Sequence, residues 1–302
     1  MVYPLEIFIS RNLKKSNSFA QKEYPTWNAI IDGKVNSSIL IYGSSRAWVN
    51  INPTMIGDSL HQTVYNIGID GHNFWLQKLR DTLLLKNNVK PKLIIQSLDM
   101  FTLQKREDLY NSNQFLPYML YSNEIKNATN SYKGFSVVDY EIPLIRYYGN
   151  YEAMATACNM ALNPNNNPVE RIRGYQGQDI SWNADFDRAK LTMKNYHVKL
   201  DTNTVTLFEQ YLKKSNENNI AIIFVYSPEY VEGQKFVDNR EEIINIYTQL
   251  GKKYNIPFYD FSRDSISFKK DLFYNASHLN KTGAEVFTKK LIGTLRKHTL
   301  RN

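Results

Sequence analysis

The chain of 302 residues contains very little cysteine: Cys158 is the only one, so no internal disulfide can form. A single cysteine fits a reducing compartment, and it fits equally a bacterial extracytoplasmic protein built without disulfides. The cysteine and histidine residues show no zinc-binding spacing. We expect neither a metal nor an organic cofactor.

Long apolar runs are also missing from the sequence. No stretch is apolar enough to span a membrane, and the N-terminal stretch does not resemble a signal peptide. The sequence begins abruptly, as a protein separated from an upstream anchor would, which raises the expectation of a membrane anchor outside this chain. A bacterial extracytoplasmic or periplasmic location is then expected, while a cytoplasmic location stays open.

Acidic residues are in the minority, with 29 Asp and Glu against 37 Lys and Arg, and the net charge is +8. Such a balance suits a nucleic acid, an anionic polymer or a membrane surface. The basic residues are scattered, however, and are densest only in the C-terminal stretch KKLIGTLRKHTLRN. Because the sequence has no basic helix and no known nucleic-acid motif, we expect no nucleic-acid partner.

Short apolar runs that alternate with helical patterns are present in number. The predicted strands are 38–43, 62–68, 91–98, 220–227 and 256–262. The predicted helices are 72–88, 201–219, 239–255 and a last one that closes the chain. This alternation predicts an α/β fold that is doubly wound around a mostly parallel five-stranded sheet, of the flavodoxin-like type.

About a hundred residues, roughly 100–200, separate the third and fourth predicted strands, which is too long for a plain crossover. This insertion contains the helical stretch YEAMATACNMAL, the linker NPNNNPVE and many aromatic residues. We expect one α/β domain over 1–302 in which the insertion forms a helical cap over the carboxyl edge of the sheet. Extra helices that pad one side of the domain are the alternative.

Polar residues follow several predicted strands, at the edge where ligands bind in such sheets. The first strand ends in GSSRA, the second in NIGIDG and the third in QSLD, and a late stretch reads NASHLNKTGA. Asn280 is a plausible N-cap, which would keep His278 in the loop before the last helix. A histidine there can reach a serine after the first strand, and serine needs such a base to become a nucleophile.

These blocks resemble those of the SGNH hydrolases, also called GDSL-type esterases. GSS stands for the first block, so the resemblance makes Ser45 the nucleophile. NIGIDG stands for the second block and supplies Gly71, which with the Ser45 backbone N–H would form the oxyanion hole. SHLNKTGA stands for the end of the fourth block, so the resemblance makes His278 the base. The resemblance runs from about 36 to 295, with the insertion outside it. It is closest to a bacterial branch among surface-polysaccharide and cell-wall genes, which O-acetylates or deacetylates glycans.

Two positions depart from the family pattern. Asn275 stands where the family has an aspartate three residues before the histidine, and Leu98 stands where it has the oxyanion asparagine. The side-chain oxygen of Asn275 can still accept from the imidazole N–H and orient the ring, although it cannot stabilise the imidazolium as a carboxylate does. The alternative groups are Asp264 or Asp271 for the first role and Gln96, Asn73 or a backbone amide for the second.

Further residues near this edge are candidates for substrate binding: Arg46, His72, Asp99, Tyr226 and Glu229. The alternative is that these residues have no part in catalysis or substrate binding. The Gly-Ser-Ser turn can be a phosphate-binding or structural turn, Arg46 can be solvated or ion-paired, and Gly71 can serve backbone conformation only.

The combined expectation is a serine-dependent O-acyl esterase, typically an acetyl esterase, or an acyltransferase, with a carbohydrate or cell-surface glycan ester as its partner. The alternative is a catalytically inactive glycan-binding or polysaccharide-assembly protein that kept the fold. Fold alone does not decide between them.

Overall fold

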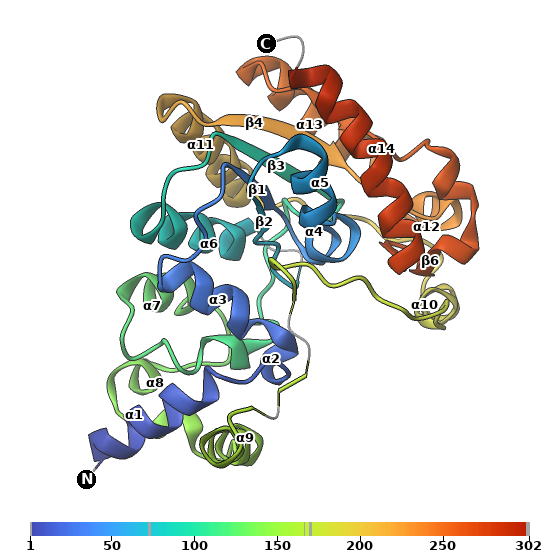
Figure 1. Ribbon diagram of the computed structural model, residues 1–302. Coiled ribbons are helices and arrows are strands. Elements are labelled where there is room, and N and C mark those ends of the chain that lie inside the picture. The colour runs from blue at the N-terminus through green and yellow to red at the C-terminus, as the bar shows by residue number, and fades with distance from the viewer. Residues whose placement is uncertain (1, 72–73, 166, 169–170, 300–302) are drawn as a thin grey trace. The chain divides into compact units, whose positions relative to one another are not determined.

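A computed structural model describes residues 2–71, 74–165, 167–168 and 171–299 (Figure 1). The chain divides into two compact units. The first comprises 1–35, 78–89 and 106–171, and the second comprises 36–77, 90–105 and 172–302. Within the described ranges, none of the helices combines the length and apolar character needed to traverse a bilayer.

The second unit is built on a five-stranded sheet of order β2-β1-β3-β4-β5, in which every neighbouring pair is parallel (Figure 1). Its strands are β1 (Ile39–Tyr42), β2 (Val64–Asn66), β3 (Leu93–Leu98), β4 (Ala221–Tyr226) and β5 (Phe258–Asp260). Each strand lies within one of the predicted apolar runs. The order matches the flavodoxin-like pattern, whose strand order reverses between β1 and β3, and the predicted fold class is confirmed.

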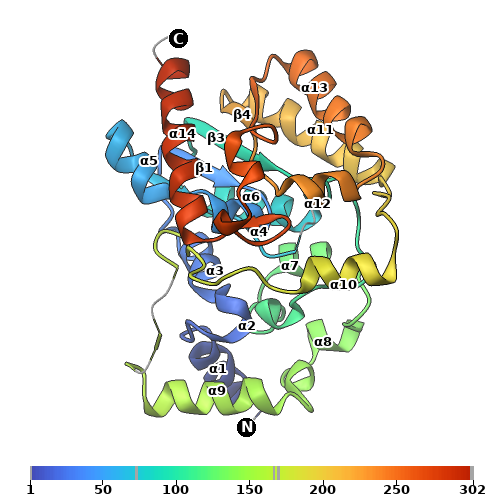
Figure 2. The same cartoon turned by 90° about the vertical axis from the view of Figure 1, so that its right-hand side faces the viewer.

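Helices cover both faces of this sheet because strand side chains alternate between them. On β4, Ile223 and Val225 belong to the apolar core that also contains residues of α4 (Ser45–Asn50), α5 (Pro53–Leu60) and α14 (Lys281–Thr299). Phe224 points to the other face, where its ring lies 5.8 Å from that of Phe208 on α11 (Thr202–Glu217). Ring contacts join α11 there to α6 (Phe74–Asn87) and α13 (Arg240–Tyr254). Figure 2 shows α14 and α5 together, apart from α11 and α13.

A second, two-stranded sheet precedes the last helix. It pairs β6 (Phe273–Asn275) with β7 (His278–Leu279) in antiparallel fashion. Asn280 follows β7, and its side-chain oxygen accepts from Gly283 N at 3.0 Å, as the predicted N-cap of α14 would. The hairpin therefore delivers His278 directly before a capped helix. The remaining short helices of this unit are α10 (Asp185–Thr192), α12 (Val231–Phe236), η3 (Ser265–Phe268) and η4 (Lys270–Leu272).

The first unit is helical and is held by buried charges. Its elements are α1 (Val2–Leu13), α2 (Phe19–Lys22), α3 (Tyr24–Ile31), η1 (Ser112–Phe115), α7 (Asn123–Thr129), α8 (Val137–Glu141), η2 (Ile145–Tyr147) and α9 (Tyr151–Leu162), besides the last part of α6. Glu6 pairs with Arg146, and Glu23 pairs with Arg80 and, at 3.0 Å, with Arg171. All five side chains are fully buried.

This unit differs in extent from the predicted insertion at 100–200. Residues 106–171 group with the N-terminal 35 residues, whereas residues 172–200 belong to the second unit. The Glu6–Arg146 pair and a hydrogen bond of 2.9 Å from Trp27 to Gln114 illustrate the reason. The interruption of the α/β pattern in the sequence shows where the insertion begins. It does not show which distant segments of the chain pack against the insertion. The role of a cap stays a prediction.

Candidate active site

A tight turn connects β1 to α4 and is enforced by Gly43, whose φ is +145°. A Cβ at this position would lie 2.8 to 2.9 Å from the Ser97 carbonyl oxygen and the Ala47 Cβ, so only glycine fits. The next residue, Ser44, is the N-cap of α4: its Oγ accepts from Arg46 N at 3.3 Å. The same hydroxyl donates to Asp99 Oδ2 at 2.5 Å, and Ser44 is 1% exposed. Ser44 is therefore committed to holding the turn.

Ser45 is the first residue of α4 and is partly exposed. Its Oγ lies 2.8 Å from Nε2 of His278, although 233 positions separate the two residues in the chain. Its backbone N–H lies in the first turn of a helix, where the N–H groups have no partner four residues earlier. The turn thus places one hydroxyl next to an imidazole, at the start of a helix.

The other side of the imidazole is held by Asn275. The Oδ1 atom of Asn275 lies 2.9 Å from His278 Nδ1, and it accepts the backbone N–H groups of Ser277 at 3.1 Å and His278 at 2.9 Å. Backbone N–H groups can only donate, so the side-chain oxygen must face them, and the amide orientation is fixed. Facing this oxygen, Nδ1 carries the proton. Nε2 is then the bare nitrogen that can accept from the Ser45 hydroxyl.

Two more contacts orient the histidine hairpin. The Tyr274 ring stacks on the His278 ring with centroids 5.3 Å apart and planes 16° apart. Asn50, at the end of α4, accepts from Leu279 N at 3.1 Å and donates to Ser227 Oγ at 3.0 Å. Asn50 thereby joins the helix of Ser45 to the strand of His278. Sequence reasoning missed this residue, because nothing in the local pattern distinguishes it from an ordinary asparagine at a helix end.

A buried ion-pair cluster holds α4 against the segment that follows β4. Arg46 pairs with Glu229 and donates to Ser227 Oγ at 2.8 Å, while Glu229 also accepts from Arg240 at 2.6 Å. Both guanidinium carbons lie over the Tyr226 ring, at 4.7 Å for Arg46 and 5.0 Å for Arg240. Because Arg46 directly follows Ser45, this cluster fixes the position of the candidate nucleophile.

Electrostatics in the cluster keep the Tyr226 phenol neutral and the Arg46 guanidinium charged. Burial raises the pKa of Tyr226, Glu229 raises it further, and the two arginines oppose this only in part, so the phenol stays neutral. Desolvation lowers the pKa of Arg46, but Glu229, Tyr226 and Asp99 outweigh it and the pKa is raised. Arg46 is thus a permanent cation.

The expectation that Arg46, Asp99, Tyr226 and Glu229 contact substrate is not supported. They are 3%, 1%, 0% and 6% exposed, and their polar groups bond within the chain. Asp99 holds Ser44 and accepts from Phe101 N at 2.8 Å. The ion-paired reading of Arg46 is the one that its contacts support. His72 lies outside the described residues.

The candidate oxyanion hole is carried by the chain after β2. Ile69 N donates to the Gly43 carbonyl at 3.0 Å, which places this segment beside the serine turn, and Gly71 follows with φ of +82°. Gly68, the other glycine of this segment, packs so tightly that a Cβ would lie 2.8 Å from Trp48 N. The second block therefore needs glycine for close approach at Gly68 and for a left-handed backbone at Gly71.

The structure shows the surroundings of several residues that were candidates to replace the oxyanion asparagine and the aspartate of the family pattern. Leu98 is fully buried on β3, and Gln96 is fully buried and donates to Gln77 at 3.2 Å, so both side chains are used in the interior. Asn73 lies outside the described residues. Asp264 is ion-paired with Lys290 at 2.6 Å, whereas the acceptor at Nδ1 of His278 is Asn275.

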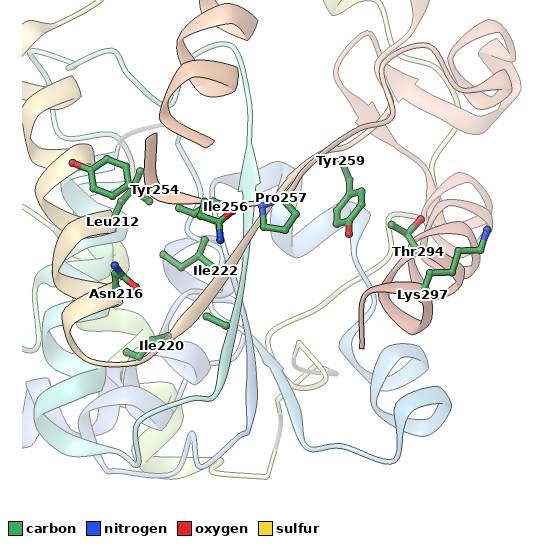
Figure 3. Close-up of a pocket in the computed structure, with 12 residues that line it drawn as sticks. Leu212, Asn216, Ile220, Ile222, Tyr254, Ile256, Pro257, Tyr259, Thr294 and Lys297 are labelled. Atoms are coloured by element: carbon green, nitrogen blue, oxygen red, sulfur yellow. The ribbon is translucent and has the colours of Figure 1, made fainter. Parts of the chain in front are cut away.

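No cluster of three or more potential metal ligands occurs among the residues that the structure covers. Figure 3 shows a hollow of about 780 Å³, whose lining includes neither Ser45 nor His278. It is lined by Ile220 and Ala221 at the start of β4 and by Pro257 before β5, and hence belongs to the opposite, amino end of the strands.

No protein-family model matches the chain, and no curated protein matches it. Solved structures with a related arrangement exist. An acetyl xylan esterase aligns with a TM-score of 0.42 and 12% identity, over 85% of this chain and 98% of that chain. A carbohydrate acetylesterase family member from Sinorhizobium meliloti aligns with a TM-score of 0.36 and 12% identity, over 86% of this chain and 97% of that chain. Likenesses this distant assign neither a family nor an activity.

Proposed function

We propose that this chain is a serine-dependent O-acyl esterase or acyltransferase of the SGNH type. The observation that carries the proposal is the hydrogen-bonded series from Ser45 Oγ to His278 Nε2, at 2.8 Å, and from His278 Nδ1 to Asn275 Oδ1, at 2.9 Å. Nucleophile, base and orienting group are thus in contact and in the correct order.

The reaction follows from these contacts. Ser45 Oγ attacks the ester carbonyl carbon while its proton moves to His278 Nε2, and the carbonyl π electrons move onto oxygen. Two backbone donors, Ser45 N–H and Gly71 N–H, stabilise that oxyanion. Collapse expels the alcohol, which takes the proton from Nε2, and leaves an acyl group on Ser45. Water or an acceptor hydroxyl then attacks with His278 again as base, which gives hydrolysis or transfer.

The substrate class is a carbohydrate ester, because the motif resemblance of GSS, NIGIDG and SHLNKTGA is to proteins that act on glycan esters. No cofactor takes part in this chemistry. An extracytoplasmic location goes with the same resemblance and forms part of the proposal.

The second candidate is an inactive glycan-binding or assembly protein. Asn275 and Leu98 favour it, because they replace the carboxylate and the asparagine of the family pattern. The contact between Ser45 and His278 favours the esterase, since a binding protein has no need of a base 2.8 Å from a serine hydroxyl.

Labelling with a fluorophosphonate probe tests the proposal. We expect labelling of the wild type, loss of labelling in Ser45→Ala and in His278→Ala, and retention in His61→Ala, a control histidine at the end of α5. Absence of labelling in a folded wild type, judged by its thermal unfolding, would leave the inactive binding protein as the better reading. Labelling that survives Ser45→Ala would show that the nucleophile is another residue.

A further inference from the structure

An apolar cavity of about 300 Å³ lies in the second unit, at the carboxyl edge of the sheet. Two aromatic pairs line it: Phe101 with Tyr196, ring centroids 5.5 Å apart, and Phe186 with Phe236, 5.6 Å apart. Both pairs are T-shaped, so each ring is held by its partner. Such a lining suits an apolar ligand group, and the mechanism described above makes no use of it.

The cavity is joined to the candidate nucleophile along two separate routes. Asn275 lines the cavity and contacts His278, which contacts Ser45. Glu229 also lines the cavity and pairs with Arg46, the residue after Ser45. Each route crosses only one intervening residue. The cavity therefore lies at the same edge of the sheet as the candidate nucleophile, two contacts away from it, among segments that follow β3 and β4.

One wall of the cavity is closely packed. Gly233 of α12 and Ala276 of the histidine hairpin both line it, and a Cβ added to Gly233 would lie 2.8 Å from the Ala276 Cβ. Tyr230 N donates to the Ala276 carbonyl at 2.9 Å, which fastens the two segments together. Ala189 of α10 contributes a small side chain to the wall, which leaves the interior open.

The size of the cavity limits what it can hold. A protein cavity of about 150 Å³ with an apolar lining binds benzene, which has six carbons. The present cavity of about 300 Å³ is twice as large, and it exceeds what an acetyl methyl group would fill. An acyl group of roughly six to ten carbons matches this volume.

We propose that this cavity binds the acyl group of the ester, and that this group is an alkyl or aryl acyl group larger than acetyl. The proposal rests on the proposed esterase function and narrows its substrate class from any O-acyl ester to esters of longer, apolar acids.

The test compares p-nitrophenyl acetate, hexanoate, octanoate and phenylacetate as substrates of the wild type and of Ala189→Trp. Ala155→Trp is the matched control, since Ala155 is an exposed alanine on α9 in the other unit. A buried methylene contributes about 0.8 kcal/mol, or about fourfold in kcat/KM. We expect kcat/KM to be at least about tenfold higher for hexanoate than for acetate. Ala189→Trp should remove this gain with little change for acetate, while Ala155→Trp should keep it. A relative rise with phenylacetate instead of octanoate would identify an aryl group.

A binding measurement separates failure of the cavity proposal from failure of the esterase proposal. Titration calorimetry with hexanamide and acetamide, which cannot be cleaved by the Ser45→Ala variant used here, reports on the cavity without turnover. If Ser45→Ala binds hexanamide more tightly than acetamide and Ser45→Ala/Ala189→Trp does not, the cavity proposal is supported. Should the wild type then hydrolyse no ester, only the esterase proposal would be overturned. A preference for acetate, an equal effect of Ala189→Trp on all chain lengths, or equal binding of the two amides would overturn the cavity proposal.

Discussion

The two halves of the candidate site are held in place by different physics. The serine half rests on buried charges: Arg46 and Arg240 share Glu229, and Asp99 accepts from Ser44. The histidine half is oriented through the neutral side chain of Asn275. The comparison separates two tasks that a carboxylate often performs together. Positioning needs only a well-placed acceptor, whereas stabilising an imidazolium needs a negative charge.

The serine half holds two guanidinium groups and two carboxyl groups in the interior. Buried charges of this kind are costly to desolvate, and they stabilise a structure only while each retains its partner. The histidine half avoids that cost. It holds its ring with an amide oxygen that backbone N–H groups keep in one orientation, and thereby keeps the tautomer that the base requires.

The largest expected effect comes from removing the shared carboxylate of the serine half. Glu229→Gln removes the carboxylate that Arg46 and Arg240 share as ion-pair partner in the interior, so we expect the free energy of unfolding to fall by about 3–5 kcal/mol. Urea unfolding at neutral pH measures it. Glu232→Gln is the control, because Glu232 pairs with Lys235 on the surface, and its loss should cost no more than about 1 kcal/mol. Equal losses in both variants would mean that the buried cluster does not anchor the turn.

Removing the acceptor of the histidine half should affect the rate more than the stability. Asn275→Ala takes away the oxygen that fixes the proton on Nδ1, so the ring can turn or change tautomer. We expect kcat/KM for an activated ester to fall by about 10²–10⁴-fold, the usual contribution of a positioned base. Urea unfolding shows whether the fold is kept. A folded variant with unchanged kcat/KM would remove Asn275 from the mechanism.

A smaller effect is expected where the serine half meets its helix cap. Ser44→Ala removes the cap of α4 and leaves Asp99 without the Ser44 hydroxyl, so we expect a loss of about 2 kcal/mol in the free energy of unfolding. Asn52→Ala removes only a cap, that of α5, and should cost about 1 kcal/mol. Fluorophosphonate labelling should persist in folded Ser44→Ala. Loss of labelling there would transfer the nucleophile role to Ser44.

Sequence reasoning reached the sheet from local signals, and it reached the pairing of Ser45 with His278 from the same signals together with the motif resemblance. Buried parallel strands are continuous apolar runs, and the ends of such strands meet at one edge. A capped helix start after His278 then fixes which loop carries the base. The same logic did not anticipate that Arg46 and Glu229 are buried and paired with each other, because charged residues that follow a strand look exposed until a distant partner is known.

The unpredicted residues share this dependence on distant partners. Asn50 contacts residues 177 and 229 positions away in the chain, and neither contact leaves a periodic trace in the sequence. The grouping of residues 1–35 with 106–171 likewise depends on pairs such as Glu6 with Arg146, which are 140 positions apart. Pairing over such separations is decided by the folded arrangement and not by local propensity.

The smallest expected effect sharpens the comparison most directly. Asn275→Asp gives the histidine half the charge that it lacks, while the oxygen facing Nδ1 and the backbone N–H groups is retained. A carboxylate stabilises the imidazolium that forms in the transition state, so the alkaline plateau of kcat/KM should rise by about tenfold, or about 1.4 kcal/mol. The same charge favours the protonated ring in the free enzyme, so the acid limb of the pH–rate profile should move to higher pH. Both changes must occur together if the lack of negative charge at Asn275 limits the rate. A plateau that stays level while the acid limb moves would show instead that the charge reaches the histidine but that proton transfer to it does not limit the rate.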